Sequence, residues 1–418
     1  MSVPTTAVET AAPAPGRMDT RSRMWLYLLA GFVLVALVRV VSGANDVDSA
    51  GTLRAALESA IPIALAGLGG LWSERAGVVN IGLEGMMIAG TLGAGYFGYH
   101  YGAVAGILGA VLFGALVGAL HAMATVTFGV DHIVSGVAIN IIALGVAGFL
   151  AESFFSALPG GGPTQSPELP SVTSIDISFL SDPATTIQNK HWFLVSDLAS
   201  VVGALTKELS LFTVFALLLI AGTGWLLWKT SFGLRLRSVG ESPAAAESLG
   251  VDVYRYKFIA VVVSGAMAGL AGAFLAMVAS SGFQQGQTNG RGYIGLAAMI
   301  FGNWRPGGML LGSSLFGYTQ AMQLRSGGES LHALLLVVFV ILLAVAALQL
   351  VRKNRTQAVL SGLLGVLFLV WYLSTDKVPR EFTTMAPYVT TLLVLAFAAQ
   401  KLRMPAADGR PYRKGSAG

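Results

Sequence analysis

The chain has 418 residues, of which 54% are hydrophobic and only 11% are charged, whereas soluble domains carry roughly a quarter charged residues. Water therefore cannot be its main solvent, and its 52 glycines favour helices that pack closely in a membrane. The absence of cysteine excludes disulfide frameworks, thiolate metal sites and cysteine nucleophiles. The net charge of +5 comes from short basic clusters beside apolar runs, which indicates membrane orientation rather than nucleic-acid binding.

The N-terminal stretch 1–23 is rich in Ala, Pro, Ser and Thr and precedes an uncharged run over 24–38. This run is too long for the apolar region of a typical signal peptide and lacks a small-residue cleavage pattern. It therefore predicts a retained first helix. We expect residues 1–23 to form a disordered cytoplasmic tail.

Spanning helices need about 20 mainly apolar residues, because the hydrocarbon core is about 30 Å thick and each helical residue rises about 1.5 Å. Twelve segments come near this requirement: 25–42, 53–71, 78–98, 103–127, 132–157, 209–228, 257–280, 288–302, 308–325, 331–351, 356–374 and 384–400. The segment 288–302 is short and broken by glycine, which predicts a half-helix or a re-entrant piece. The sequence thus predicts an all-α, polytopic transmembrane bundle of about 10–12 helices with broken or re-entrant segments.

The charges in the loops predict the side of the membrane on which each loop lies. Basic residues gather in 229–257, in 352–355 and in the C-terminal tail, which places these segments in the cytoplasm. The 158–208 loop and the 43–53 turn carry more acidic than basic residues, so we expect them outside. Twelve helices with both termini inside satisfy these assignments. Arg39, near the outer end of the first helix, is expected to reach the lipid headgroups.

The spans divide the chain into four parts. After the tail 1–23, we expect a transmembrane core over 24–325, a transmembrane hairpin over 326–375, and a final helix with a basic cytoplasmic tail over 376–418. The external loop 158–208 contains five prolines and a run of three glycines. It predicts either a polar connector or a docking surface for an external solute-binding protein.

The segment 71–87 places polar groups between two apolar runs. Charged groups at membrane depth are costly unless they are paired or face a polar cavity. Asn80 and Glu84, four residues apart and thus on one helical face, either line a pathway or hydrogen-bond a neighbouring helix. Glu74 and Arg75 favour a mutual ion pair that caps the cytoplasmic end of a helix. The glycines that allow the backbone to break are Gly77, Gly82 and Gly85.

The predicted cytoplasmic loop 230–257 contains a helix signature. Ser242 before Pro243 is typical of an N-cap with proline at the first helical position, and Gly250 is typical of a C-terminal stop. A helix of about two turns is not stable alone in water, so it must pack on something. It is either a connector resting on the membrane helices or a surface whose alanines, 244–246, enter a groove in a partner.

Three further segments offer weaker signals. Asp131 before His132 favours an N-cap over a proton relay. The turn around Trp304 and Arg305 is predicted at the cytoplasmic interface. The polar segment 280–293 is either a hydrated turn or a substrate mouth. In the second case the residues that hydrogen-bond sugar hydroxyls or stack on a base would be Phe283, Gln284, Gln287 and Asn289.

Four separated segments together resemble one family. They are SERAGVVNIGLEGMM over 73–87, GESPAAAESLGV over 240–251, SGAMAGLAGA over 264–273 and MPAADGRPY over 404–412. In this order they resemble the nucleoside-type ABC permeases, part of a larger permease family that includes ribose and branched-chain amino-acid importers. The helices in 326–375 depart from the short connection expected there, so they look like an accessory addition.

The resemblance implies roles for two sets of residues. The first set would form a coupling helix that docks on a separate ATPase, with three alanines at the contact: Gly240, Glu241, Ala244, Ala245, Ala246 and Gly250. The second set would lie beside the translocation path: Asn80, Gly82, Glu84 and Gly85.

The resemblance also implies partners and a location. We expect an ABC ATPase subunit, a second permease subunit that is usually a different chain, and an extracytoplasmic solute-binding lipoprotein, in the plasma (inner) membrane of a prokaryote. No G-x-x-x-x-G-K-[ST] phosphate loop occurs, so the chain is not expected to be an enzyme, and ATP would bind a partner. We expect no directly bound cofactor, no metal and no nucleic-acid partner.

Two other functions are consistent with the residues alone. In an ion-coupled secondary transporter, Glu84, Asp131 and Glu152 would carry the coupling proton or ion. A membrane scaffold subunit would have no transport path. The solute follows from the resemblance only, with ribose-like sugars or a nucleoside-containing vitamin as alternatives to nucleosides.

Overall fold

Helices make up nearly all the regular structure of the computed structural model, which describes residues 20–325, 327–379, 381–383, 385–386, 389 and 402–415. In chain order they are α1 (Thr20–Ser42), α2 (Ala50–Arg75), α3 (Leu83–Tyr101), α4 (Ala103–Ala122), α5 (His132–Phe155), α6 (Ser178–Gln188), α7 (Val195–Thr206), α8 (Leu211–Lys229), α9 (Ser231–Glu241), α10 (Pro243–Ser248), α11 (Val253–Phe274), α12 (Arg291–Phe301), α13 (Pro306–Arg325), α14 (Gly327–Val351) and α15 (Arg355–Ser374). Short π-helical turns, η1 (Met123–Thr127) and η2 (Leu275–Ala279), extend α4 and α11. The strands β1 (Ser174–Ile175) and β2 (Leu209–Ser210) pair antiparallel.

Seven of the described helices are long and apolar enough to cross a membrane, namely α2, α4 with η1, α5, α8, α11 with η2, α14 and α15. The helices α1, α3, α12 and α13 occupy four more of the predicted spans. The predicted all-α polytopic bundle is therefore confirmed, and α12, with 11 residues, is the short helix predicted over 288–302.

The two ends of the chain are described in part. α1 begins at Thr20, inside the predicted tail 1–23, whose residues 1–19 lie outside the described residues. Most of the helix predicted over 384–400 also lies outside them. The two helices predicted in 326–375 are α14 and α15, where the rings of His332 and Tyr372 stack with their centroids 4.5 Å apart.

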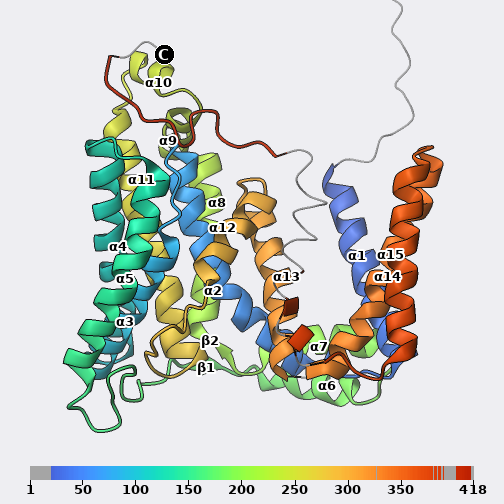
Figure 1. Ribbon diagram of the computed structural model, residues 1–418. Helices are drawn as coiled ribbons and strands as arrows, with labels where there is room; N and C mark the ends of the chain where they lie inside the picture. The colour runs from blue at the N-terminus through green and yellow to red at the C-terminus, as the bar shows by residue number, and fades with distance from the viewer. Residues whose placement is uncertain are drawn as a thin grey trace, which may run out of the picture.

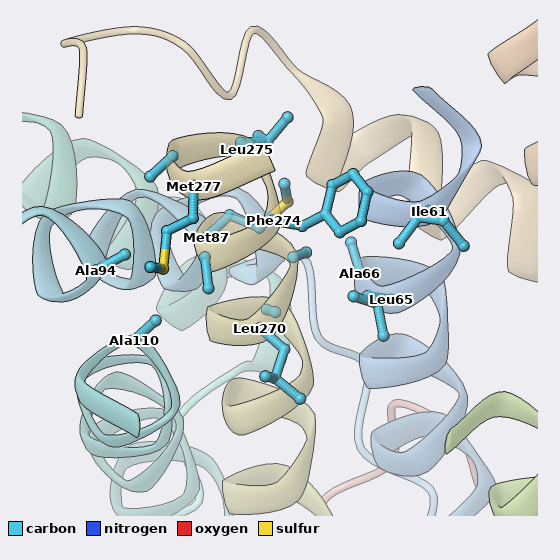
Figure 2. Close-up of a cluster of buried hydrophobic side chains, with 14 of the residues drawn as sticks. Ile61, Leu65, Ala66, Met87, Ala94, Ala110, Leu270, Phe274, Leu275 and Met277 are labelled. Carbon is cyan, nitrogen blue, oxygen red and sulfur yellow. The ribbon is translucent and has the colours of Figure 1, made fainter. Parts of the chain in front are cut away.

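Helices α2 and α11 form the centre of the bundle. Ile61 and Leu65 of α2 lie with Leu270 and Phe274 of α11 in one buried apolar cluster, which Met87 of α3 completes (Figure 2). Lipid is as apolar as these side chains, so close packing rather than exclusion of water holds such helices together.

Small residues set the distance between α11 and α4. A methyl group on Gly265 would collide with the backbone carbonyl of Gly114, and one on Gly269 would collide with the carbonyl of Ala110. Only glycine permits this approach of two backbones. It is the small-residue packing that membrane helices favour.

The sequence around α2 recurs around α11. AGLGG at 66–70 and IGLEGMM at 81–87 correspond to AGLAG at 268–272 and IGLAAMI at 294–300. The two units run in opposite directions, because α2 ends beside α9 whereas α11 begins just after α10. In each unit an irregular segment separates the long helix from a following helix that starts inside the bundle. Inverted pairs of broken helices are an architecture of membrane transporters.

The two ends of the bundle carry different structures (Figure 1). One end holds α9, α10 and the 402–415 segment, all within stretches predicted to be cytoplasmic. The other end holds α6, α7 and the β1–β2 pair, which together occupy much of the predicted external loop 158–208. No motif predicted this structure. α7 packs on the start of α2, where Gly203 lies against Ala50.

The prediction that Arg39 reaches the lipid headgroups is wrong. Its side chain is 3% exposed, and its Nε atom lies 2.8 Å from a carboxylate oxygen of Asp197 on α7 and 3.3 Å from one of Asp48. A buried charge is costly without partners, and the carboxylate of Asp197 together with the carboxyl group of Asp48 stabilises the arginine inside the protein. The contact with Asp197 also joins α1 to α7.

Candidate functional site

The connection between α2 and α3, residues 76–82, is unwound within the bundle, and side chains satisfy its backbone. The hydroxyl of Ser73 donates to the carbonyl of Val78 at 2.5 Å, and the ammonium of Lys257 donates to the carbonyl of Gly77 at 3.1 Å. Backbone groups removed from water need such partners. The predicted break is therefore present and stabilised at Gly77 and Gly82, whereas Gly85 lies in the first turn of α3.

Two histidines hold the next residue of the unwound segment, Val79. Its N–H donates to Nδ1 of His132 at 3.3 Å, and its carbonyl oxygen lies 3.3 Å from Nε2 of His121. Asp131 accepts hydrogen bonds from the backbone N–H groups two and three residues later, so the predicted N-cap of α5 is confirmed. His132 thus serves the unwound segment rather than pairing with Asp131.

Asn80 and Glu84 do not share a helical face, because Asn80 lies in the unwound segment before α3 begins. Its amide donates to the hydroxyl of Ser264 on α11 at 2.8 Å. The two carboxylate oxygens of Glu84 accept hydrogen bonds from the N–H groups of Gly290 and Gly292, at the start of α12, at 2.8 and 2.7 Å. One carboxylate therefore joins the N-terminal ends of α3 and α12, and its charge offsets the positive ends of both helix dipoles.

Asn140 of α5 connects both broken regions. Its oxygen accepts from the N–H of Gly85 at 2.7 Å, and its amide donates to the carbonyl of Ile81 at 3.0 Å and to the hydroxyl of Tyr293 at 2.9 Å. Backbone and side-chain atoms crowd Gly85, where a methyl group would approach the carbonyl of Ile139 to 2.9 Å. In the sequence, the position of Asn140 as a polar residue in the otherwise apolar helix α5 is the signal that could indicate these contacts.

The four residues predicted beside the translocation path thus lie together at the helix breaks. Asn80 and Glu84 are buried, and the backbone at Gly82 comes close to α5, since a methyl group there would lie 3.5 Å from the Cα atom of Gly136. The contacts of this group hold α3, α5, α11 and α12 to one another. Its place beside a path stays a prediction.

The predicted substrate mouth, 280–293, comprises the connection between η2 and α12 and the first residues of α12. Phe283 is 1% exposed, and its ring packs 5.8 Å from that of Phe155, so it is not free to stack on a solute in this conformation. Gln284 and Asn289 are exposed. Gln287 is half-buried, and its oxygen accepts a hydrogen bond from a serine hydroxyl of the same loop.

The predicted coupling loop forms two helices, α9 and α10. Pro243 opens α10, and Gly250, with φ of +80°, follows its end, as the sequence predicted. The side chains of Ala244 and Ala245 are exposed, whereas Ala246 is 2% exposed and packs with valines on both sides of the loop. Two of the three alanines therefore face outward.

The predicted ion pair between Glu74 and Arg75 is absent from the described contacts, because each residue has another partner. Glu74 accepts a hydrogen bond from the indole N–H of Trp304 at 2.6 Å. Arg75 donates to the backbone carbonyl of Trp304 at 2.7 Å and lies 3.9 Å from a carboxylate oxygen of Glu241. Trp304 is 3% exposed, so its predicted position at the membrane interface is wrong.

The described residues contain no group of three or more His, Asp or Glu side chains that could hold a metal ion. The polar contacts instead join helix ends, loops and unwound backbone. An arrangement of this kind can change the relative positions of helices, since it has discrete broken segments and small-residue interfaces.

A family described as "Branched-chain amino acid transport system / permease component" matches residues 53–347. The matched range starts in α2 and ends in α14. It includes both broken regions and α10, and it leaves out α1 and α15. The predicted boundary at residue 326 stays a prediction.

Three similar proteins share most of the chain. The guanosine ABC transporter permease protein NupQ of Bacillus subtilis is 33% identical, over 86% of this chain and 96% of NupQ. The nucleoside ABC transporter permease protein NupC of Lactococcus lactis is 34% identical, over 84% and 93%. The putative glucose ABC transporter permease protein TsgC13 of Haloferax volcanii is 32% identical, over 88% and 98%. No solved structure matches the chain.

Proposed function

Because the chain belongs to the family of branched-chain amino acid transport system permease components, we propose that it is a membrane-spanning permease subunit of an ATP-driven importer for nucleosides or related small sugar-containing solutes. Two of the three similar proteins are named for nucleosides or guanosine and one, putatively, for glucose. A sugar ring is common to these solutes. Nucleosides are the solute class we propose.

One observation carries the coupling part of this proposal. The short helix α10 presents Ala244 and Ala245 outward at one end of the bundle. At the same end, Gly240 lies so close to the unwound segment that a methyl group on it would lie 3.1 Å from the backbone nitrogen of Gly77. The base of α10 therefore lies beside the helix break, where a partner that moves α10 could influence it.

The proposed complex contains several other subunits. A separate ATPase binds ATP and docks on α10, since the sequence of this chain has no phosphate loop. A second permease subunit, a paralogue of this chain, completes the pathway, and a lipoprotein outside the membrane delivers the solute. The complex resides in the inner membrane of a prokaryote. This chain binds neither a cofactor nor a metal ion directly.

The structural roles of the acidic residues argue against an ion-coupled transporter. Glu84 accepts two backbone hydrogen bonds, Asp131 caps α5, and Glu152 is exposed on the surface of α5. These positions do not form one chain of titratable groups. A proton relay would need such a chain.

Substitution of Ala245 by arginine tests the coupling contact. The larger charged side chain should block docking of the ATPase, so uptake and co-purification of the ATPase should both fall by about tenfold or more, while membrane insertion persists. Ala157→Arg, an exposed alanine at the opposite end of the bundle, is the matched control and should leave ATPase binding unchanged. Normal ATPase binding by Ala245→Arg would contradict the proposal.

The solute class is tested with the reconstituted complex. We expect nucleosides, added with the binding lipoprotein, to stimulate ATP hydrolysis, and ribose or glucose to stimulate it less. Stimulation by glucose alone would replace nucleosides as the proposed solute. Uptake by this chain alone, driven by a proton gradient, would instead support the ion-coupled transporter.

A further inference from the structure

Residues 402–415, called the C-terminal segment below, run along the end of the bundle that holds α9 and α10 (Figure 1). The segment contains no helix or strand, yet Pro405, Ala407 and Asp408 are buried. Irregular segments usually stay on the surface. Burial at these three positions therefore indicates that the segment is docked at defined points.

One set of contacts joins the C-terminal segment to the end of α9. The N–H of Ala407 donates to the carbonyl of Gly240 at 2.9 Å. The N–H of Ala406 donates to the carboxylate of Glu241 at 3.2 Å. Both acceptors are at the C-terminal end of α9, directly before α10, so the segment binds the residues from which α10 starts.

A second set joins the segment to α10 itself and to the start of α11. The hydroxyl of Tyr412 donates a hydrogen bond to the carboxylate of Glu247 on α10. The ring of Tyr412 lies 5.5 Å from that of Tyr254, whose hydroxyl donates to the carbonyl of Tyr412 at 3.3 Å. The segment thus contacts both sides of the coupling loop.

A third set reaches the unwound segment 76–82. Gly77 has a φ of +79°, and a methyl group on it would lie 3.2 Å from the carbonyl oxygen of Ala407. Gly409 lies against Val79. The same short stretch that binds the base of α10 is therefore packed on the helix break.

Asp408 is the buried carboxyl group at the centre of this junction. Its side chain is 7% exposed, and its carboxyl interacts electrostatically with Glu74, Lys257 and Arg75. Burial raises the pKa of Asp408 to about 7. Lys257 at the same time donates to the carbonyl of Gly77, so Asp408 acts on the residue that holds the unwound backbone.

We propose that the C-terminal segment is a positioning element that links α10 to the unwound segment 76–82, so that movement of α10 reaches the helix break through it. This inference rests on the proposed function, because it takes α10 as the contact with the ATPase. The segment does not touch the solute. It acts through Gly77 and Lys257, and its loss should uncouple ATP hydrolysis from uptake.

Asp408→Lys tests this role in the reconstituted complex. The new cation faces Lys257 and Arg75, so like-charge repulsion should unseat the segment. We expect uptake per ATP hydrolysed to fall by about tenfold, within the usual range of coupling between sites, while the ATPase still co-purifies. Asp408→Asn keeps the shape without the charge and should stay near wild type. Lys414→Ala, an exposed site, is the control.

A crosslink distinguishes unseating from general damage. The chain has no cysteine, so Glu241→Cys and Ala406→Cys can be joined selectively within it by a short bis-maleimide. In the Asp408→Lys background, this crosslink should restore coupled uptake. Unchanged uptake per ATP in Asp408→Lys, or no recovery after crosslinking, would overturn the inference while ATPase binding persists. Failure of the wild-type chain to bind an ATPase would overturn the proposed function instead.

Discussion

Glu84 shows how one side chain can organise a broken region in a membrane. Its carboxylate accepts hydrogen bonds from Gly290 and Gly292, while the residue itself lies in the first turn of α3. The N–H groups at the start of α12 thus find their acceptor on a residue in the first turn of α3, and the carboxylate lies near the positive ends of both helix dipoles. The carboxylate therefore has a structural role, because it connects the first inverted unit, which contains Glu84, to the second, which contains Gly290 and Gly292.

Removal of this carboxylate should separate the two helix starts. Glu84→Ala leaves buried N–H groups without an acceptor, so we expect it to lower stability by about 2–4 kcal/mol and to abolish uptake. Glu84→Gln should cost less, because its amide oxygen can still accept from one N–H. Thermal unfolding in detergent measures the difference, and Glu152→Gln, at an exposed site, is the control. Intact uptake by Glu84→Ala would contradict this role.

At the scale of residues, the sequence predicted local structure well and long-range partners poorly. Asp131, Pro243 and Gly250 act on their own backbone, so their type and spacing were sufficient. Trp304 and Phe283 are buried by segments far away in the chain, which no local pattern reveals. An aromatic residue beside a predicted turn was therefore placed at a surface that the fold covers.

At the scale of elements, glycine contacts decide which helices can touch. Gly265→Ala should force α11 away from α4, because the new methyl group would collide with the carbonyl of Gly114. We expect a loss of about 1–3 kcal/mol, the usual cost of overpacking, as a lower unfolding temperature. Gly145→Ala on α5, where nothing lies within 4 Å, should be near neutral. Equal effects of the two substitutions would show that this contact does not limit packing.

The stability that Arg39, Asp48 and Asp197 contribute by holding α1 in place should depend on pH. Burial, together with the neighbouring carboxyl of Asp197, raises the pKa of Asp48 to about 8. The groups that face it are Arg39, Asp197 and the hydroxyl of Tyr318. Because the folded state holds this proton more tightly than the unfolded state, its stability should fall as the pH rises from about 4 toward 8.

Asp48→Asn removes the titrating group and provides the control for this pH dependence. The stability of wild type relative to Asp48→Asn should decrease across the same pH interval, as measured by thermal unfolding at each pH. Parallel pH curves for the two proteins would show that Asp48 does not titrate in this range.

Short helices were also harder to predict than long spans. The half-helix α12 was found because glycine interrupts its apolar run. The helices α6 and α7 lie across the end of the bundle opposite α10 and have too few apolar residues in sequence to resemble a span (Figure 1). The glycines of segment 76–82 indicated that the helix breaks there, but they did not indicate how many residues are unwound. The length of the break depends on side chains from elsewhere in the chain, which replace the missing helical hydrogen bonds.

At the scale of the whole molecule, the fold is built around two similar units that run in opposite directions. α2 and α11 carry matching AGLGG and AGLAG stretches and run in opposite directions, and each leads into a broken segment. The repeat was visible in the sequence as two short similarities about 200 residues apart, but they are too brief to stand out before the helices are paired. In the structure the correspondence is clear, because AGLGG lies in α2 and AGLAG lies in α11, the two central helices.

The orientation of the molecule can be tested without removing any native thiol, since the chain has no cysteine. The basic end carries α10 and the α14–α15 turn, and the opposite end carries the 280–290 loop; the positive-inside rule places the basic end in the cytoplasm. A membrane-impermeant maleimide added to intact spheroplasts should therefore label Gln284→Cys and Ala157→Cys. It should label Ser248→Cys and Lys353→Cys only after the membrane is opened. The reverse pattern would invert the topology and place α10 out of reach of any cytoplasmic ATPase, which would remove the basis of the coupling mechanism.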